Sequence, residues 1–264
     1  MSNATVVNKK DNILTITMNR PIALNALNLE MTEALNEAIC DAEQDKEVRC
    51  VVIRGSNHFM AGGDLKWFAK KLNEVPEKKR IEFERLIEKV HRMVISIRRM
   101  PKPVVASVNG ATAGFGFSLA MACDLIIASD SAVFTLAYVN VGVSPDGGST
   151  FSLPRIVGAK KAAEIAFLGD VLDAATAKEL GLVNWVVRTE DLEIETVKLA
   201  TRLANGPTAV IGRTKSLLQQ SLNTTLESQL HAEAMNFSVS ASEPNFVEGV
   251  SAFIGKCKPK FKRN

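Results

Sequence analysis

Hydrophobic and polar residues recur along the chain with two different periods, and these periods predict its secondary structure. Short runs of β-branched and apolar residues, typical of buried strands, lie at 13–18, 48–53, 104–108 and 125–128. Apolar residues spaced three and four apart predict amphipathic helices, the longest over 78–100. Strands and helices alternate as far as about residue 187, which is the pattern of a mainly parallel α/β fold.

The pattern changes near residue 200. Beyond Glu190 the strand-like runs stop, and residues 191–204, 207–222 and 225–240 each carry a helical period. A helical C-terminal segment of this kind is often an oligomerisation or lid element. We therefore expect two parts: a core over residues 1–200 and a helical oligomerisation region over residues 201–264.

Composition and charge argue against several classes of protein. The 264 residues are 46% hydrophobic, and 32 basic residues face 29 acidic ones, for a net charge of +3. This balance gives no electrostatic footprint for nucleic acid. No run approaches the roughly 18–20 apolar residues that span a bilayer, and the polar N-terminus lacks the apolar core of a signal peptide. We expect a cytoplasmic protein with no membrane partner.

Cysteine and histidine usage predicts no metal site. The four cysteines are scattered without a CxxC pair, and the three histidines lie far apart. The basic residues near the C-terminus, Lys256 and Lys260 among them, are interpreted either as a solvated tail or as a site that attracts a polyanion.

Two glycine-rich turns are the first candidates for chemistry. The first covers residues 58–65 (HFMAGGDL) and the second residues 109–116 (NGATAGFG). Each links an expected strand to an expected helix, so free N–H groups point out of the turn. Asp64 is placed to cap the helix that follows the first turn. The second turn lacks GxGxxG spacing, and each turn alone is also explained by the need of a tight turn for glycine.

Taken in order with other segments, the two turns resemble the enoyl-CoA hydratase/isomerase (crotonase) family. The matching segments are Asn19-Arg20-Pro21, Asn25-Ala26-Leu27, Ala61-Gly62-Gly63-Asp64, 103–110, Cys123-Asp124, 153–158, 177–183 and 248–253. The resemblance covers nearly the whole chain. It implies a spiral of repeated strand-strand-helix units, with a C-terminal helical region that forms trimers or pairs of trimers. It also implies an acyl-CoA substrate. Because the coenzyme A is part of that substrate, the resemblance implies no separate cofactor.

The resemblance also implies where the site lies. The family's oxyanion hole consists of two backbone N–H groups, which fall on Ala61 and Phe115 here. Two preorganised donors stabilise an enolate oxygen more than a neutral thioester oxygen. Phenylalanine replaces the usual glycine at the second position, so its side chain must face away from that oxygen. The remaining residues expected to contact substrate are Ala26, Leu27, Gly62, Gly63, Asp64, Lys66, Gly114, Ser118 and Tyr138.

The reaction is indicated by which carboxylates are present. The family's hydratases handle water with two glutamates, and those positions are Ser118 and Tyr138 here. Asp146 lies nearby in a Ser-Pro-Asp-Gly segment, which alone is common turn chemistry. Family isomerases carry a lone acid at this position, including those that act on the ring epoxide of phenylacetyl-CoA breakdown. We therefore expect a double-bond isomerase in which Asp146 moves one proton from C2 to C4.

The surroundings of Asp146 carry a further expectation. Apolar residues nearby are expected to exclude water and to raise the pKa of its carboxyl. They are Phe117, Phe134, Leu136 and Val143.

Three alternatives stay open. One is a hydratase. A second resembles the 4-chlorobenzoyl-CoA dehalogenases, which use an aspartate nucleophile and a histidine matching His91, although they carry tryptophan at the position of Tyr138. His91 is otherwise interpreted as a surface or packing residue. The third is a non-catalytic binding protein, RNA-binding members included, for which a single tyrosine offers little base stacking.

Overall fold

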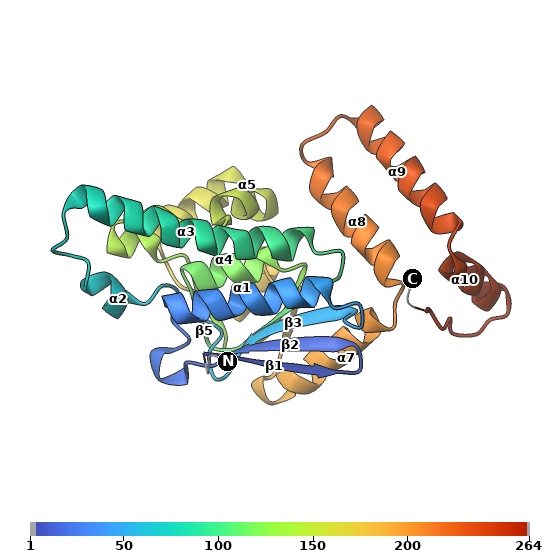
Figure 1. Cartoon of the computed structure of the whole chain (residues 1–264), viewed down its shortest axis with the longest axis horizontal. Coiled ribbons are helices and arrows are strands. Elements are labelled where there is room, and N and C mark those ends of the chain that lie inside the picture. Colours follow the sequence, from blue (N-terminus) through green and yellow to red (C-terminus); the bar gives the residue numbers. More distant parts are fainter. Residues whose placement is uncertain (1–3, 263–264) are drawn as a thin grey trace.

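A six-stranded sheet forms the centre of the computed structural model, which describes residues 4–262 (Figure 1). Its order is β1-β2-β3-β4-β6-β9; β1 pairs antiparallel with β2, and all further neighbours are parallel. Parallel neighbours need crossover connections, which the helices provide. The strands are β1 (Thr5–Lys10), β2 (Ile13–Met18), β3 (Cys50–Gly55), β4 (Val104–Val108), β6 (Leu125–Ser129) and β9 (Trp185–Val187).

Helices cover both faces of this sheet because successive strand residues point to opposite sides. Val51 and Ile53 of β3 enter the main core, which they share with α1 (Leu29–Gln44) and α3 (Pro76–Arg99). Cys50 and Val52 of the same strand enter a smaller cluster with residues of α7 (Leu192–Ala204). Each fully buried side chain of this kind contributes about 1.5–3 kcal/mol.

A second, three-stranded sheet lies where the two glycine-rich turns meet. Its order is β5-β7-β8, and Met60 of the first turn forms a parallel bridge to Thr112 of β5. α4 follows β5 directly, and all its residues are buried, which suits a sequence that is apolar at every position except Ser118. The elements of this part are β5 (Ala111–Ala113), α4 (Phe115–Ala122), β7 (Val133–Thr135), η2 (Tyr138–Val141), α5 (Ser149–Leu168), β8 (Leu172–Asp173) and α6 (Ala174–Glu179).

The last three helices reach away from the sheets (Figure 1). They are α8 (Thr208–Ser221), α9 (Leu226–Ala241) and α10 (Pro244–Ile254). Lys215 anchors α8, because its buried Nζ donates to the Ile97 carbonyl (2.7 Å) and pairs with Asp124 (2.8 Å). Beyond α8 large apolar side chains are exposed, with Phe237 71% and Phe253 86% accessible.

Among residues 4–262, no helix combines the length and the apolar character that crossing a lipid bilayer requires.

Most expected elements are confirmed, and the differences have local causes. Helix α3 begins at Pro76, two residues earlier than predicted, because proline suits the first turn of a helix. The hydrophobic pattern did not predict two elements. One is β1, an exposed edge strand that carries lysines, and the other is α5, which contains Pro154 and the non-helical Gly158. The boundary expected after residue 200 falls inside α7, and the division into two parts stays a prediction.

Candidate functional site

The two glycine-rich turns lie against each other through backbone hydrogen bonds. The Met60 amide donates to the Ala111 carbonyl (3.1 Å), and the Ala113 amide donates to the Met60 carbonyl (2.8 Å). Glycine is required where the turns cross, because a Cβ on Gly116 would lie 2.2 Å from the Met60 oxygen. The backbone positions on either side of this contact are therefore fixed relative to each other.

His58 stabilises the contact between the two turns through hydrogen bonds to the second turn and to Asn25. Its Nδ1 accepts a hydrogen bond from the Ala111 amide (3.1 Å), and its carbonyl accepts one from Asn25 Nδ2 (2.6 Å). Its ring lies beside Gly110, where a Cβ would approach Nδ1 to 2.3 Å. Sequence reasoning gave His58 no role of its own, since a lone histidine in a turn carries no spacing signal.

The two expected oxyanion donors differ in their surroundings. Phe115 is the first residue of α4, and its amide has no acceptor among residues 4–262. Its ring is buried and packs near Gly147, and the expectation that it faces away from the substrate oxygen stays a prediction. The positive end of α4 adds to the attraction for an anionic oxygen.

The Ala61 amide departs from the expectation of a free donor. It donates to the Leu24 carbonyl at 3.0 Å. Leu24 and Asn25 both have left-handed backbone angles, with φ of 49° and 56°, and this local fold turns the Leu24 carbonyl towards the first turn. An oxygen that uses the Ala61 amide must share or displace that bond.

Ala26 and Leu27, which are expected to contact substrate, lie next to the first turn. The Leu27 amide donates to the Gly62 carbonyl (2.7 Å), and the Asp64 amide donates to the Leu27 carbonyl (2.9 Å). A Cβ on Gly114 would stand 3.6 Å from the Gly62 Cα, so the backbones of the two turns touch here. The structure thus brings together residues from three separate motifs.

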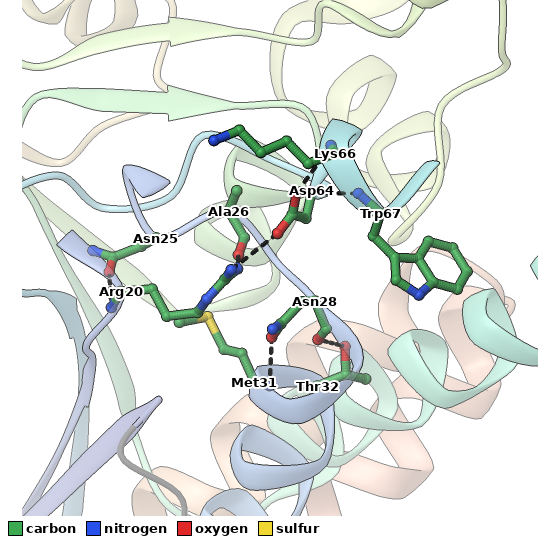
Figure 2. Close-up of polar contacts among 9 residues, drawn as sticks. All are labelled: Arg20, Asn25, Ala26, Asn28, Met31, Thr32, Asp64, Lys66 and Trp67. Atoms are coloured by element: carbon green, nitrogen blue, oxygen red, sulfur yellow. Dashed lines mark hydrogen bonds and ion pairs between the residues drawn. The ribbon is translucent and has the colours of Figure 1, made fainter. Parts of the chain in front are cut away.

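Arg20 holds this segment through a charge that sequence reasoning overlooked (Figure 2). Its Nη2 pairs with Asp64 Oδ2 at 2.9 Å, and its Nη1 donates to the Ala26 carbonyl. Asp64 Oδ1 accepts from the Lys66 and Trp67 amides, which confirms Asp64 as the cap of α2 (Leu65–Ala69). The Lys66 side chain is exposed, and here only its amide contributes.

The pKa of Asp64 reflects these partners. Burial alone would raise it, but the Arg20 hydrogen bond, the Trp67 and Lys66 amides and the Arg20 charge together lower it. Its side chain is only 13% exposed. Asp64 is therefore an ionised structural group rather than a proton carrier.

Asp146 is held by Tyr138 and Ser118, the two positions at which the resemblance implies glutamates in hydratases. Tyr138 Oη donates to Asp146 Oδ1 at 2.5 Å. Ser118 Oγ lies 3.0 Å from the Asp146 carbonyl oxygen and 3.2 Å from Tyr138 Oη. Ser118 stands one helical turn after Phe115 on α4, so the backbone of Asp146 is tied to the helix that begins with the free Phe115 amide.

Burial dominates the protonation of Asp146. Desolvation raises its pKa, the Tyr138 hydrogen bond and the His91 charge lower it, and the net shift is upward. Burial and the neighbouring Asp146 charge also raise the pKa of Tyr138, so its phenol stays protonated and remains a donor. A half-buried carboxyl with a raised pKa and a neutral partner is typical of a catalytic acid or base.

The four apolar residues expected to surround Asp146 differ in burial, and their shielding of its carboxyl stays a prediction. Phe117, Phe134 and Leu136 are buried, and the first two rings pack with centroids 5.4 Å apart. The prediction that Val143 excludes water is wrong, because this residue follows the left-handed Gly142 and is 52% exposed.

His91 lies closer to Asp146 than its sequence position suggested. It is exposed on α3, and its Nε2 accepts a hydrogen bond from the Gly147 amide at 3.4 Å. No group of three or more histidine, cysteine or acidic side chains within residues 4–262 is arranged to hold a metal ion.

Comparison with known proteins places this geometry among acyl-CoA enzymes. The sequence model of the enoyl-CoA hydratase/isomerase family matches residues 8–264. The 1,2-epoxyphenylacetyl-CoA isomerase of Escherichia coli (strain K12) is 36% identical over 251 residues, 94% of each chain. The crotonyl-CoA hydratase of Syntrophomonas wolfei is 33% identical over 258 residues, 97% of this chain and 96% of the relative.

A solved structure agrees with these sequence matches. The crystal structure of an enoyl-CoA hydratase from Polaromonas sp. JS666 superimposes with a TM-score of 0.92 at 37% identity, covering 98% of this chain and 99% of that chain. This confirms the expected crotonase-like α/β fold and its helical C-terminal region. Relatives named for isomerisation and for hydration are similarly close, so the residues of the site must separate the two reactions.

Proposed function

The chain belongs to the enoyl-CoA hydratase/isomerase family, and from that premise we propose that it is an enoyl-CoA double-bond isomerase. One observation carries the proposal. By resemblance, Ser118 and Tyr138 stand where the hydratases place their glutamates. Tyr138 donates to the carboxylate of Asp146, the single carboxylate of this cluster, and Ser118 contacts the backbone carbonyl of the same residue. One carboxylate suffices for a 1,3-proton transfer, since the same group accepts and returns the proton.

The mechanism needs no group beyond these residues and the substrate. The Asp146 carboxylate takes a proton from C2 of a 3-enoyl-CoA, and the C–H electrons move into the thioester to give a dienolate. The Phe115 amide, and the Ala61 amide once it leaves the Leu24 carbonyl, donate to the dienolate oxygen. Asp146 then returns its proton to C4, and the double bond comes to rest between C2 and C3.

Electrostatics favour this role for Asp146. Its raised pKa brings the carboxyl closer to the proton affinity of a dienolate carbon, which eases both halves of the transfer. The free Phe115 amide stands at the start of a buried helix, where a hydrogen bond to a charged oxygen is stronger than in water.

The test is the ultraviolet-monitored turnover of a 3-enoyl-CoA beside a 2-enoyl-CoA. The wild type is expected to conjugate the 3-enoyl compound and to leave the 2-enoyl compound unhydrated, and Asp146→Asn is expected to abolish conjugation. Asp173→Asn is the matched control, because Asp173 only caps α6 and asparagine caps equally well. Hydration of the 2-enoyl compound by both wild type and Asp146→Asn would contradict the proposal.

The acyl group is a separate question within the same proposal. A linear 3-enoyl-CoA of fatty-acid breakdown and a ring epoxide of phenylacetyl-CoA breakdown both need a base and an oxyanion hole. Assaying the two substrates with one enzyme preparation distinguishes them by their kcat/KM ratio.

A hydrolytic dehalogenation is the second candidate, favoured by the place of His91. In it Asp146 attacks the ring carbon of a 4-chlorobenzoyl-CoA, chloride leaves, and water cleaves the aryl ester as His91 accepts its proton. His91 Nε2 already accepts from the Gly147 amide and would have to release it. Chloride release that disappears in His91→Gln would support this candidate, whereas unchanged isomerisation in His91→Gln supports the first.

We further propose that the C-terminal helices join copies of this chain into a trimer or a pair of trimers. Their exposed apolar side chains are too large a surface for helices that pack only on each other. Sedimentation of the intact chain tests this, with Phe253→Asp expected to lower the assembled fraction. A monomer at micromolar concentration would contradict it.

A further inference from the structure

We propose that Tyr138 is a positioning residue that holds Asp146 by Oδ1 alone and so assigns the proton transfer to Oδ2. The inference rests on the proposed function of Asp146, and it concerns the orientation of the carboxylate that acts as the base. It gives Tyr138 and Ser118 a shared task in place of the one that glutamates perform in the family's hydratases.

The hydrogen bonds distinguish the two carboxylate oxygens. Tyr138 Oη lies 2.5 Å from Oδ1, a distance typical of a charge-assisted O–H···O bond. No donor within residues 4–262 reaches Oδ2. Since the phenol has one hydrogen and gives it to Oδ1, it has none left for Ser118. The single hydrogen of the Ser118 hydroxyl is directed to the Asp146 carbonyl at 3.0 Å or to Tyr138 Oη at 3.2 Å.

The backbone around Asp146 keeps the carboxylate from drifting. Gly147 and Gly148 are both left-handed, with φ of 62° and 78°. A Cβ on Gly147 would lie 2.7 Å from Ser118 Cβ and 2.8 Å from the Phe115 ring, so the turn packs directly on α4. The turn that carries Asp146 is thereby fixed against α4, and Tyr138 of η2 holds Oδ1. In the proposed mechanism Oδ2 then carries the proton between C2 and C4.

The Tyr138 bond also sets how readily Asp146 ionises. The titratable groups that face Asp146 are Tyr138 from η2 and His91 from α3. Burial raises the pKa of Asp146, and the Tyr138 hydrogen bond opposes that rise. Because the base must be ionised, removing this bond raises the pKa and moves the acid limb of kcat/KM to higher pH.

The first experiment compares pH–rate profiles. Tyr138→Phe is expected to move the acid limb upward by about one pH unit, as the loss of a hydrogen bond to a charged group predicts. Its kcat on the pH-independent plateau is expected to fall roughly tenfold, because the Asp146 carboxylate is no longer held in one orientation, and its KM is expected to change little. Ser118→Ala keeps the phenol and is expected to lower kcat without that shift. Val141→Ala, an exposed residue of the same short helix, is the control.

A second experiment uses the fact that Tyr138 is the single tyrosine of the chain. Uniform 3-fluorotyrosine labelling then gives one ¹⁹F resonance that reports on this phenol. We expect its chemical shift to titrate with the same midpoint as the acid limb of the wild type, and to lose that titration in Asp146→Asn. His91→Gln must leave the titration in place, because His91 is the other group that could move the resonance.

The outcomes separate this inference from the proposed function. An unshifted acid limb in folded Tyr138→Phe, or a ¹⁹F resonance that is flat across the wild-type acid limb, overturns the positioning role. If Tyr138→Phe does not fold, the labelled wild type still decides. A titrating resonance in a chain that isomerises no 3-enoyl-CoA would leave the contact intact and remove the proposed reaction.

Discussion

Two aspartates in turns, Asp64 and Asp146, show how neighbours decide what a carboxylate does. Asp64 is bound by the Arg20 guanidinium and two amides, and its pKa is lowered. Asp146 is bound by an uncharged phenol, and burial raises its pKa. The first arrangement stabilises a fixed negative charge and the fold around it. The second keeps a proton exchangeable, and stability is the expected cost.

The largest expected difference between the two is in catalysis. Asp146→Asn should lower kcat by about 10²–10⁴, which is the contribution of a positioned acid or base. Its thermal midpoint at pH 7 should stay equal or rise. The sign follows because a raised folded pKa stabilises only at low pH, so an ionised Asp146 weakens the fold at neutral pH. Calorimetry beside the rate assay measures both, and a lowered midpoint would assign Asp146 to the structure.

The next effect concerns the amide on the Asp146 side of the site. Phe115 is the first residue of α4, where proline is tolerated. Phe115→Pro removes the N–H and should lower kcat by about 10²–10³. Phe115→Leu keeps the N–H and is the control for the lost ring. Equal activity of the two variants would mean that this amide does not serve the reaction.

On the Asp64 side the expected loss is in stability and binding. Arg20→Ala leaves a carboxylate of low exposure and the Ala26 carbonyl without their donor, which costs about 1–3 kcal/mol. The thermal midpoint should fall by roughly 2–4 °C for each kcal/mol in a chain of this size. Acyl-CoA KM should rise more than kcat falls. A normal midpoint with a collapsed kcat would place Arg20 in the chemistry instead.

The smallest expected effect is a pH dependence. Because the folded pKa of Asp64 lies below its unfolded value, its contribution is full above about pH 4, the unfolded value, and is lost as pH falls through the folded pKa. Asp64→Asn keeps the cap of α2 but loses the charge. Denaturation midpoints of the two chains should differ at pH 7 and converge below pH 4. A constant difference would show that the charge of Asp64 contributes nothing.

The sequence predicted the parts of the site that have local signatures. Asp64 as a helix cap and the two turns follow from residue type and spacing, whereas Asp146 was singled out by the family resemblance. Arg20 and His58 were missed because their partners lie 44 and 53 residues away, at Asp64 and Ala111. Such pairings depend on how the fold brings distant turns together. The spacing of hydrophobic residues predicts helices and strands but does not predict these contacts. Asn25 tolerates a left-handed backbone, but Leu24 gives no sign of it.

Under the proposed function, the Leu24 carbonyl that accepts from the Ala61 amide competes with the substrate oxygen for that donor, and it belongs to the same chain. Dilution cannot remove such a rival, whose effective concentration is set by the chain. A neutral thioester oxygen exchanges for a peptide carbonyl with little gain. A charged enolate oxygen, which forms stronger hydrogen bonds, exchanges with a clear advantage. The loop at Leu24 thus weakens the binding of the neutral thioester oxygen more than the binding of the charged enolate oxygen, which favours the reaction over the binding of substrate alone.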